Sequence, residues 1–447
     1  MSCILFSSPP FVAPLSSAGP KRRREKIIRQ LFPSICLVAS LLVPTVASAA
    51  EGLVCRDEIA CVMIGPDDPV TIAWMLVTSG ANSFFGEDSL GGIEIAIAQR
   101  EGILLGREIE LIGEDSQCTP EGGQLAAQRL VANEHILAII GPSCSSAAEA
   151  AIPVASRAGF VLVTPTAVSS TLTNPDRDSG GTWMPGFFRT IHTNALQGRM
   201  AARFAREILD AQTLATIHDG STFAHDLQGA MIGTFIELGG EVVYQGAVNV
   251  GDTDMTAVLT EIATHGPDLL FFPIFQPEGD FLVAQAQYIP DLDNTILMGS
   301  DNLLTPGFVV ATGEAALGVI LFGPNVAGET YREFLSLWQE RYGAEPPGGF
   351  HAHAFDTTNL LLDAIESVAQ VGEDGSVLIG RQALRDAMTA TSGFDGITGS
   401  LACSPTGDCA TAEAIGVFRI GEPEVFEGRW PPELVWTPAT GGPEEEA

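Results

Sequence analysis

The sequence predicts an α/β protein made of two lobes, each a parallel sheet covered by helices on both faces and joined to the other by a hinge. Short apolar runs alternate with longer segments of helical period along most of the chain. This alternation is typical of doubly wound parallel sheets. The runs are too many for one comfortable sheet, and 447 residues suffice for two domains with separate cores.

The apolar runs are the expected strands. They are Val70–Val77, Glu108–Ile112, His135–Gly141, Phe160–Pro165, Leu214–His218, Glu241–Val248, Leu269–Phe275, Thr295–Gly299 and Gly318–Phe322. The expected helices are Leu90–Arg100, Gly123–Asn133, Ala147–Arg157, Gln197–Leu209, Phe223–Leu238, Tyr331–Tyr342 and Ala354–Ala369. We expect the first crossing between the lobes in the polar stretch Thr190–Ala195.

The same pattern predicts the domain limits. The first lobe is expected to comprise residues 71–192 and 325–395, and the second lobe residues 193–324 and 396–435. Residues 51–70 precede the first lobe as a segment closed by a disulfide loop. Residues 436–447 are acidic and rich in proline and glycine, a composition that favours disorder.

Residues 1–50 have the pattern of a secretory signal preceded by an extension. A basic cluster from Lys21 to Arg29 leads into the apolar stretch Leu31–Val46, which ends in the small residues Ala47–Ala50. No stretch of the chain approaches the ~20 apolar residues of a membrane span. We therefore expect a periplasmic or extracellular protein. The residues before Cys36 do not support a lipoprotein signal, although lipid anchoring stays open.

Six cysteines beyond this leader fall into three pairs that are close in sequence. In an oxidising compartment they indicate three disulfides, with free buried thiols as the alternative. The pairs are Cys55 with Cys61, Cys118 with Cys144, and Cys403 with Cys409. No C-x-x-C spacing accompanies them, and the histidines of His351-Ala352-His353 point in different directions on a helix. We expect no metal and no cofactor.

The chain beyond the leader is strongly acidic. Without residues 1–50 its net charge is about −38, and no lysine follows Lys26. Such a surface repels nucleic acid and anionic lipid, so it excludes binding that depends on basic patches.

Polar turns follow two of the expected strands, where ligands bind in sheets of this type. Pro142–Ser146 comes directly before a helix, whose first N–H groups attract an anion. Simple capping by Ser145 or Ser146 is the alternative. A second polar turn runs from Thr164 to Ser170, and the two turns together could hold one carboxylate.

An acidic residue and three aromatic residues follow other strands or turns. Asp301 comes after Thr295–Gly299 and could hold an ammonium group, although an acidic residue in this chain is more often an ordinary surface residue. Phe85, Phe223 and Phe275 could form the apolar wall of a small-molecule cleft, or belong to the core.

Several segments together resemble the periplasmic leucine/isoleucine/valine-binding proteins of type I fold, over residues 70 to 425. The segments are Gly113–Cys118, Gly141–Ser146, Thr164-Pro165, Ile217–Gly220, Val248–Met255 and Met298–Asp301. The resemblance implies a Cys118–Cys144 disulfide, a carboxylate-binding role for Ser145 and an ammonium-binding role for Asp301, which is one methylene shorter than the family's usual glutamate.

The chain also departs from the family pattern. Contacts of the next turn fall on Thr166 and Val168, where a threonine is usual at the second place. Val168 cannot donate a hydrogen bond, which leaves Ser169 as a substitute or the ligand's amino group less firmly held. Phe85, Phe223 and Phe275 stand where the family has tyrosines.

The resemblance implies a monomeric binding protein that captures an amino-acid-like ligand by closing its lobes and delivers it to an ABC permease of the branched-chain amino acid class. A ligand sensor of the same fold, for amides, urea-like compounds or aromatics, is the alternative. An enzyme is not expected, because the sequence contains no G-x-S-x-G, no H-E-x-x-H and no glycine-rich phosphate loop. His218 beside Asp219 does not by itself make a triad.

Overall fold

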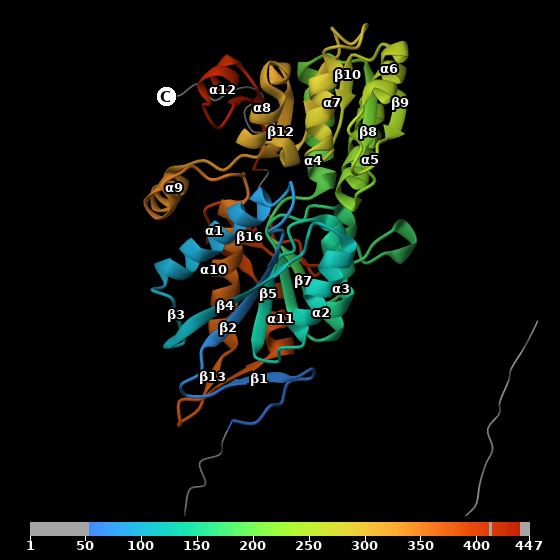
Figure 1. The fold of residues 1–447 in the computed structure, drawn as a ribbon. Helices are drawn as coiled ribbons and strands as arrows, with labels where there is room; N and C mark the ends of the chain where they lie inside the picture. The colour runs from blue at the N-terminus through green and yellow to red at the C-terminus, as the bar shows by residue number, and fades with distance from the viewer. Residues whose placement is uncertain (1–52, 411–413, 439–447) are drawn as a thin grey trace, which may run out of the picture. The chain divides into compact units, whose positions relative to one another are not determined.

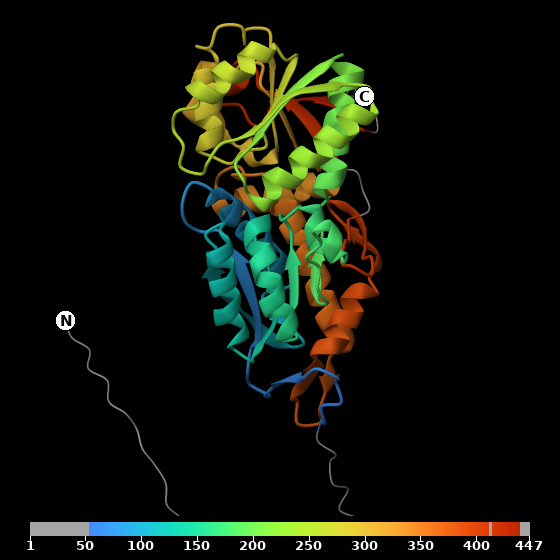
Figure 2. The ribbon, with the colours of Figure 1, turned by 90° about the vertical axis from the view of Figure 1, so that its right-hand side faces the viewer.

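The computed structural model describes residues 53–410 and 414–438, and these form two lobes, each built on one large sheet (Figure 1 and Figure 2). The predicted α/β fold class is confirmed. The expected signal over residues 1–50 and most of the expected acidic tail lie outside the described residues. Within the described ranges, no helix combines the length and the apolar character needed to cross a bilayer.

The sheet of the first lobe contains six strands. In order across the sheet they are β3 (Ile103–Leu104), β4 (Arg107–Asp115), β2 (Val70–Leu76), β5 (Ile136–Ile140), β6 (Val161–Thr164) and β7 (Phe187–Arg189). All pair in parallel except β3 with β4.

Helices cover both faces of this first sheet. Ile72 and Leu76 of β2 pack toward α1 (Phe84–Gln99) and α10 (His351–Val368). Ala73 and Met75 pack on the other face, toward α2 (Pro120–Val131) and α3 (Ser145–Arg157), as Figure 1 shows. A strand buried on both faces must be apolar along its whole length, which explains the continuous apolar runs.

The sheet of the second lobe contains seven strands. In order they are β18 (Glu433–Trp436), β17 (Ile415–Arg419), β12 (Ile320–Pro324), β11 (Ile296–Gly299), β10 (Leu269–Phe271), β8 (Thr213–His218) and β9 (Glu241–Ala247). β17 and β18 are antiparallel additions to a parallel set. The helices α4 (Asn194–Arg203) and α5 (Thr222–Glu237) cover one face, and α6 (Thr256–His265), α7 (Glu278–Ala286) and α8 (Pro306–Thr312) cover the other.

The remaining elements extend the two lobes. β1 (Cys61–Ile64) pairs with β14 (Val377–Gly380), which also pairs with β13 (Gln370–Val371). α9 (Glu329–Tyr342) and α11 (Arg381–Thr389) pack on the first lobe, and α12 (Glu422–Glu427) packs on the second.

The last passage between the lobes lies later than the boundary predicted at residue 396. The hairpin of β15 (Ser392–Gly396) and β16 (Gly399–Ala402) is fixed to the first lobe, because Asp356 of α10 accepts hydrogen bonds from the N–H groups of Ile397 at 3.0 Å and Thr398 at 2.9 Å. The chain enters the second sheet only at β17. Trp436, placed by prediction in the tail, is buried in β18.

Three disulfides join the predicted cysteine pairs, Cys55–Cys61, Cys118–Cys144 and Cys403–Cys409. The second of them ties the loop between β4 and α2 to Cys144, the residue that precedes α3. The alternative of free buried thiols is therefore wrong.

Candidate functional site

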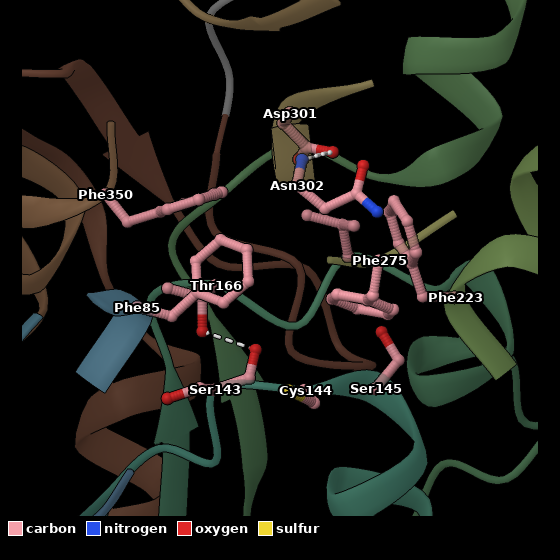
Figure 3. Close-up of a pocket in the computed structure, with 11 residues that line it drawn as sticks. Phe85, Ser143, Cys144, Ser145, Thr166, Phe223, Phe275, Asp301, Asn302 and Phe350 are labelled. Carbon is pink, nitrogen blue, oxygen red and sulfur yellow. Dashed lines mark hydrogen bonds between the residues drawn. The ribbon is translucent and has the colours of Figure 1, made fainter. Parts of the chain in front are cut away.

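A small cavity lies where the carboxyl ends of the strands of one lobe face those of the other (Figure 3). The first lobe contributes Phe85, Ser143, Cys144, Ser145, Thr166, Val168 and Phe350, and the second lobe contributes Phe223, Phe275, Asp301 and Asn302. Seven of the eight residues proposed from the sequence thus meet at one cavity. The eighth, Ser169, does not line it.

The amino end of α3 forms one wall. Its first helical hydrogen bond joins Ala148 N–H to the Cys144 carbonyl at 2.9 Å, so the N–H groups of the preceding helical residues have no partner within the helix. The Ser145 hydroxyl accepts a hydrogen bond from Ser169 N–H at 3.1 Å, which leaves its own proton available to a ligand. Together with the helix dipole, these donors favour a carboxylate.

Thr166 offers a different chemistry from the one that the sequence suggested. Its hydroxyl donates to the Ser143 carbonyl at 2.7 Å, the bond drawn in Figure 3. The proton of Thr166 is therefore engaged, and its oxygen can only accept. An acceptor suits an ammonium group better than a carboxylate.

Four phenylalanine rings line the cavity between these polar ends. The ring of Phe85 meets those of Phe350 and Phe275 at centroid distances of 5.4 and 6.1 Å, and Phe275 meets Phe223 at 5.3 Å. Because Phe85 and Phe275 belong to different lobes, these contacts close the cavity. The wall favours an apolar body on whatever occupies it.

Asp301 lies at the opposite side of the cavity and is buried without a cationic partner among the described residues. Burial raises the pKa of its carboxyl group to about 7, while the nearby Gln197 side chain and the N–H of Asn302 favour the ionised form. His192, beside the same Gln197, supplies no charge near neutral pH, because burial lowers its pKa to about 4. A ligand cation would therefore relieve an unpaired buried acid.

Comparison with known proteins fits this geometry. The sequence model of the periplasmic binding protein family matches residues 69–421. The chain belongs to this family. An amino acid binding protein of Pseudomonas aeruginosa is 32% identical over 230 residues, which are 51% of this chain and 57% of that protein. A leucine-, isoleucine-, valine-, threonine- and alanine-binding protein of the same organism is 24% identical over 73% of this chain and 86% of its own length.

A solved structure of the family has the same architecture. The leucine-binding protein LivK of Thermotoga maritima MSB8 has a TM-score of 0.71 and 26% identity, over 83% of this chain and 99% of that one. The two-lobed arrangement found here is therefore the common fold of periplasmic binding proteins.

The cavity of this periplasmic binding protein also contains residues that the sequence did not single out. Asn302 is buried, its carbonyl oxygen is paired with the Ser300 hydroxyl, and its amide nitrogen has no partner among the described residues. Phe350 lies just before α10. The position of Asn302 directly after Asp301 was a usable signal, whereas nothing in the sequence around Phe350 pointed to a cleft.

The side chains of His218 and Asp219, weighed from the sequence as part of a catalytic triad, both accept hydrogen bonds from backbone N–H groups. His218 Nδ1 accepts a hydrogen bond from Gly220 N–H at 2.9 Å, and Asp219 accepts one from Phe275 N–H at 3.2 Å. Asp219 thereby holds the backbone of a cavity residue. Across the described ranges, no group of three histidine, cysteine or acidic residues is placed to hold a metal ion.

Proposed function

We propose that this periplasmic binding protein captures an amino-acid-like zwitterion between its lobes and delivers it to an ABC importer of the branched-chain amino acid class. One observation carries the proposal. Ser145 at the start of α3 and Asp301 line the same cavity from opposite lobes. Burying both charges of a zwitterion is costly unless each meets donors or an opposite charge, and here each does.

The proposed ligand lies with its carboxylate on the α3 N-terminus and the Ser145 hydroxyl, and with its ammonium group near Asp301 and the Thr166 oxygen. Val168 and the phenylalanine rings then surround an apolar side chain. The names of the two Pseudomonas proteins and of the Thermotoga protein support amino acids of this kind. Since the rings carry no hydroxyl groups, the side chain meets no polar partner there.

Binding proceeds in two steps. The ligand docks first on the lobe that carries Ser145, which offers fixed donors. Closure then brings Phe223, Phe275 and Asp301 across it and excludes water. The closed form is what the permease recognises.

The protein acts outside the cytoplasmic membrane, and the secretory signal predicted in residues 1–50 directs its export. The protein acts as a monomer that contacts the membrane complex only at its surface. We expect it to bind its ligand without converting it, which the names of its relatives as binding proteins support.

A second function has one observation in its favour. At neutral pH a fraction of Asp301 carries a proton, since its pKa is raised to about 7, and a protonated acid tolerates a ligand without an ammonium group. Together with the four phenylalanine rings, this property of Asp301 favours a sensor. Such a sensor would bind an aromatic carboxylate or amide and signal its presence to a receptor.

Calorimetric titration of the purified mature protein decides between these ligands. L-Leucine, L-isoleucine and L-valine are compared with 4-methylpentanoate, which lacks the ammonium group of leucine, with isopentylamine, which lacks its carboxylate, and with benzoate. We expect each analogue with one charge removed to bind at least 100-fold more weakly than leucine, because one buried group loses its partner. Tight binding of benzoate without binding of any amino acid would favour the second function.

A further inference from the structure

Arg189 is a fully buried cation at the end of β7, next to the turn that carries Thr166 and Ser169. Its side chain is 0% exposed. It donates to the Ser169 carbonyl at 2.6 Å, to the Thr173 hydroxyl and to the Asp408 carboxylate. Burying a guanidinium group is costly unless its donors are satisfied, so the partners of Arg189 fix its position.

Asp408 is held in turn by a disulfide. It lies within the loop closed by Cys403–Cys409. The backbone of this loop is bonded to β7 on both sides of the ion pair, because Arg189 N–H donates to the Gly407 carbonyl at 2.8 Å and Cys409 N–H donates to the Arg189 carbonyl at 2.9 Å. The disulfide therefore fixes the carboxylate against the guanidinium group.

The other end of this chain of contacts reaches the cavity. Ser169 is clamped through both of its backbone groups, since its carbonyl binds Arg189 and its N–H donates to the Ser145 hydroxyl at 3.1 Å. A serine oxygen that accepts this N–H directs its own proton elsewhere. Because Ser145 lines the cavity, the proton of its hydroxyl can point toward a ligand bound there.

We infer that Arg189, Asp408 and the Cys403–Cys409 disulfide are positioning elements that orient the Ser145 hydroxyl for the ligand's carboxylate. The inference rests on the proposed function. It gives Ser169, which does not line the cavity, an indirect part in binding. Ligand affinity, and not stability alone, then depends on a disulfide outside the cavity wall.

The chain provides a matched control for this disulfide. Cys55–Cys61 and Cys403–Cys409 both have a sequence separation of 6, so removing either one releases a loop of the same size in the unfolded chain. Cys55 and Cys61 do not line the cavity. We expect the variant C403S/C409S and the variant D408N to bind leucine about 10-fold more weakly than the wild type, and C55S/C61S to bind within 2-fold of it.

A double-mutant cycle separates positioning from general loosening. If D408N acts through the Ser145 hydroxyl, it should cost little further affinity in an S145A background. Fully additive losses would overturn the inference.

Hydrogen exchange in the ligand-free protein provides a readout that does not depend on the ligand. The Ser169 amide should exchange faster in D408N and in C403S/C409S than in C55S/C61S. Unchanged exchange overturns the inference even if no amino acid binds. If the Ser169 amide exchanges faster in these variants as expected but the wild type binds no amino acid, only the proposed function is rejected.

Discussion

Asp301 shows how one buried acid can serve binding at the expense of stability. In the closed cavity burial raises its pKa from 3.8 to about 7. The closed form without a ligand then binds a proton that the unfolded chain, and an open form in which this carboxyl group meets water, have already released, so closure without a ligand becomes less favourable as pH rises from about 4 to about 7. A ligand ammonium group favours the ionised form and offsets this loss.

In the ligand-free protein the closed form should therefore lose population to the open form as pH rises from 5 to 7. Small-angle X-ray scattering of the ligand-free protein at each pH measures this population. The variant D301N removes the titrating group, so its ligand-free form should lose the corresponding pH dependence, and its affinity for leucine should fall by about 10- to 100-fold. A wild-type profile as flat as that of D301N would contradict this account.

At the scale of elements, a buried side chain of α1 fixes the segment that carries Phe350. Asp88 is 0% exposed and accepts hydrogen bonds from Gly348 N–H at 3.0 Å and Phe350 N–H at 2.7 Å. It also pairs with His351 Nδ1 at 2.9 Å, and His351 Nε2 contacts the Tyr331 hydroxyl at 2.8 Å. α1, α9 and α10 thus meet at His351, the residue after Phe350.

The variant D88A leaves two N–H groups and a histidine nitrogen buried without their acceptor. We expect it to lower the free energy of unfolding by about 3 kcal/mol. Leucine affinity should fall as well, by about 10-fold, as Phe350 loses its fixed position. Chemical denaturation and calorimetric titration measure the two effects.

Glu94 provides the control for Asp88 on the same helix. It pairs with Arg341 of α9 at 2.7 Å, but both side chains are partly exposed. A surface pair contributes little, so E94Q should change the free energy of unfolding by less than about 1 kcal/mol and leave affinity intact. Equal losses in the two variants would argue against a specific role of Asp88.

These elements also mark what the sequence can predict. Strands buried on both faces, such as β2 and β5, leave continuous apolar runs, and the polar turns after β5 and β6 stand out against them. β7 has only three residues and leaves no such signal. Phe350 and Arg189 could not be predicted from the sequence, because their positions depend on hydrogen bonds to Asp88 and Asp408, which are distant in sequence.

At the scale of the whole molecule, α3 of one lobe and α5 of the other meet beside the cavity. Ser146 accepts a hydrogen bond from Thr222 N–H at 3.1 Å, and the Thr222 hydroxyl donates to Glu149 at 2.8 Å. Asp226 accepts one from Ser170 N–H at 2.7 Å. Each of these bonds joins the two lobes, so we expect them only in the closed form.

The variants T222V and D226A should therefore loosen the closed form without altering the docking of the ligand on the first lobe. We expect the dissociation rate of leucine to rise about 5- to 10-fold, with the association rate within 2-fold of the wild type, since closure follows docking. Stopped-flow fluorescence measures both rates. The control E207Q removes an ion pair within the second lobe, between Arg203 and Glu207 at 3.2 Å, and should change neither rate. If association slows while dissociation is unchanged, these bonds belong to docking, and the order of the two steps proposed above must be reversed.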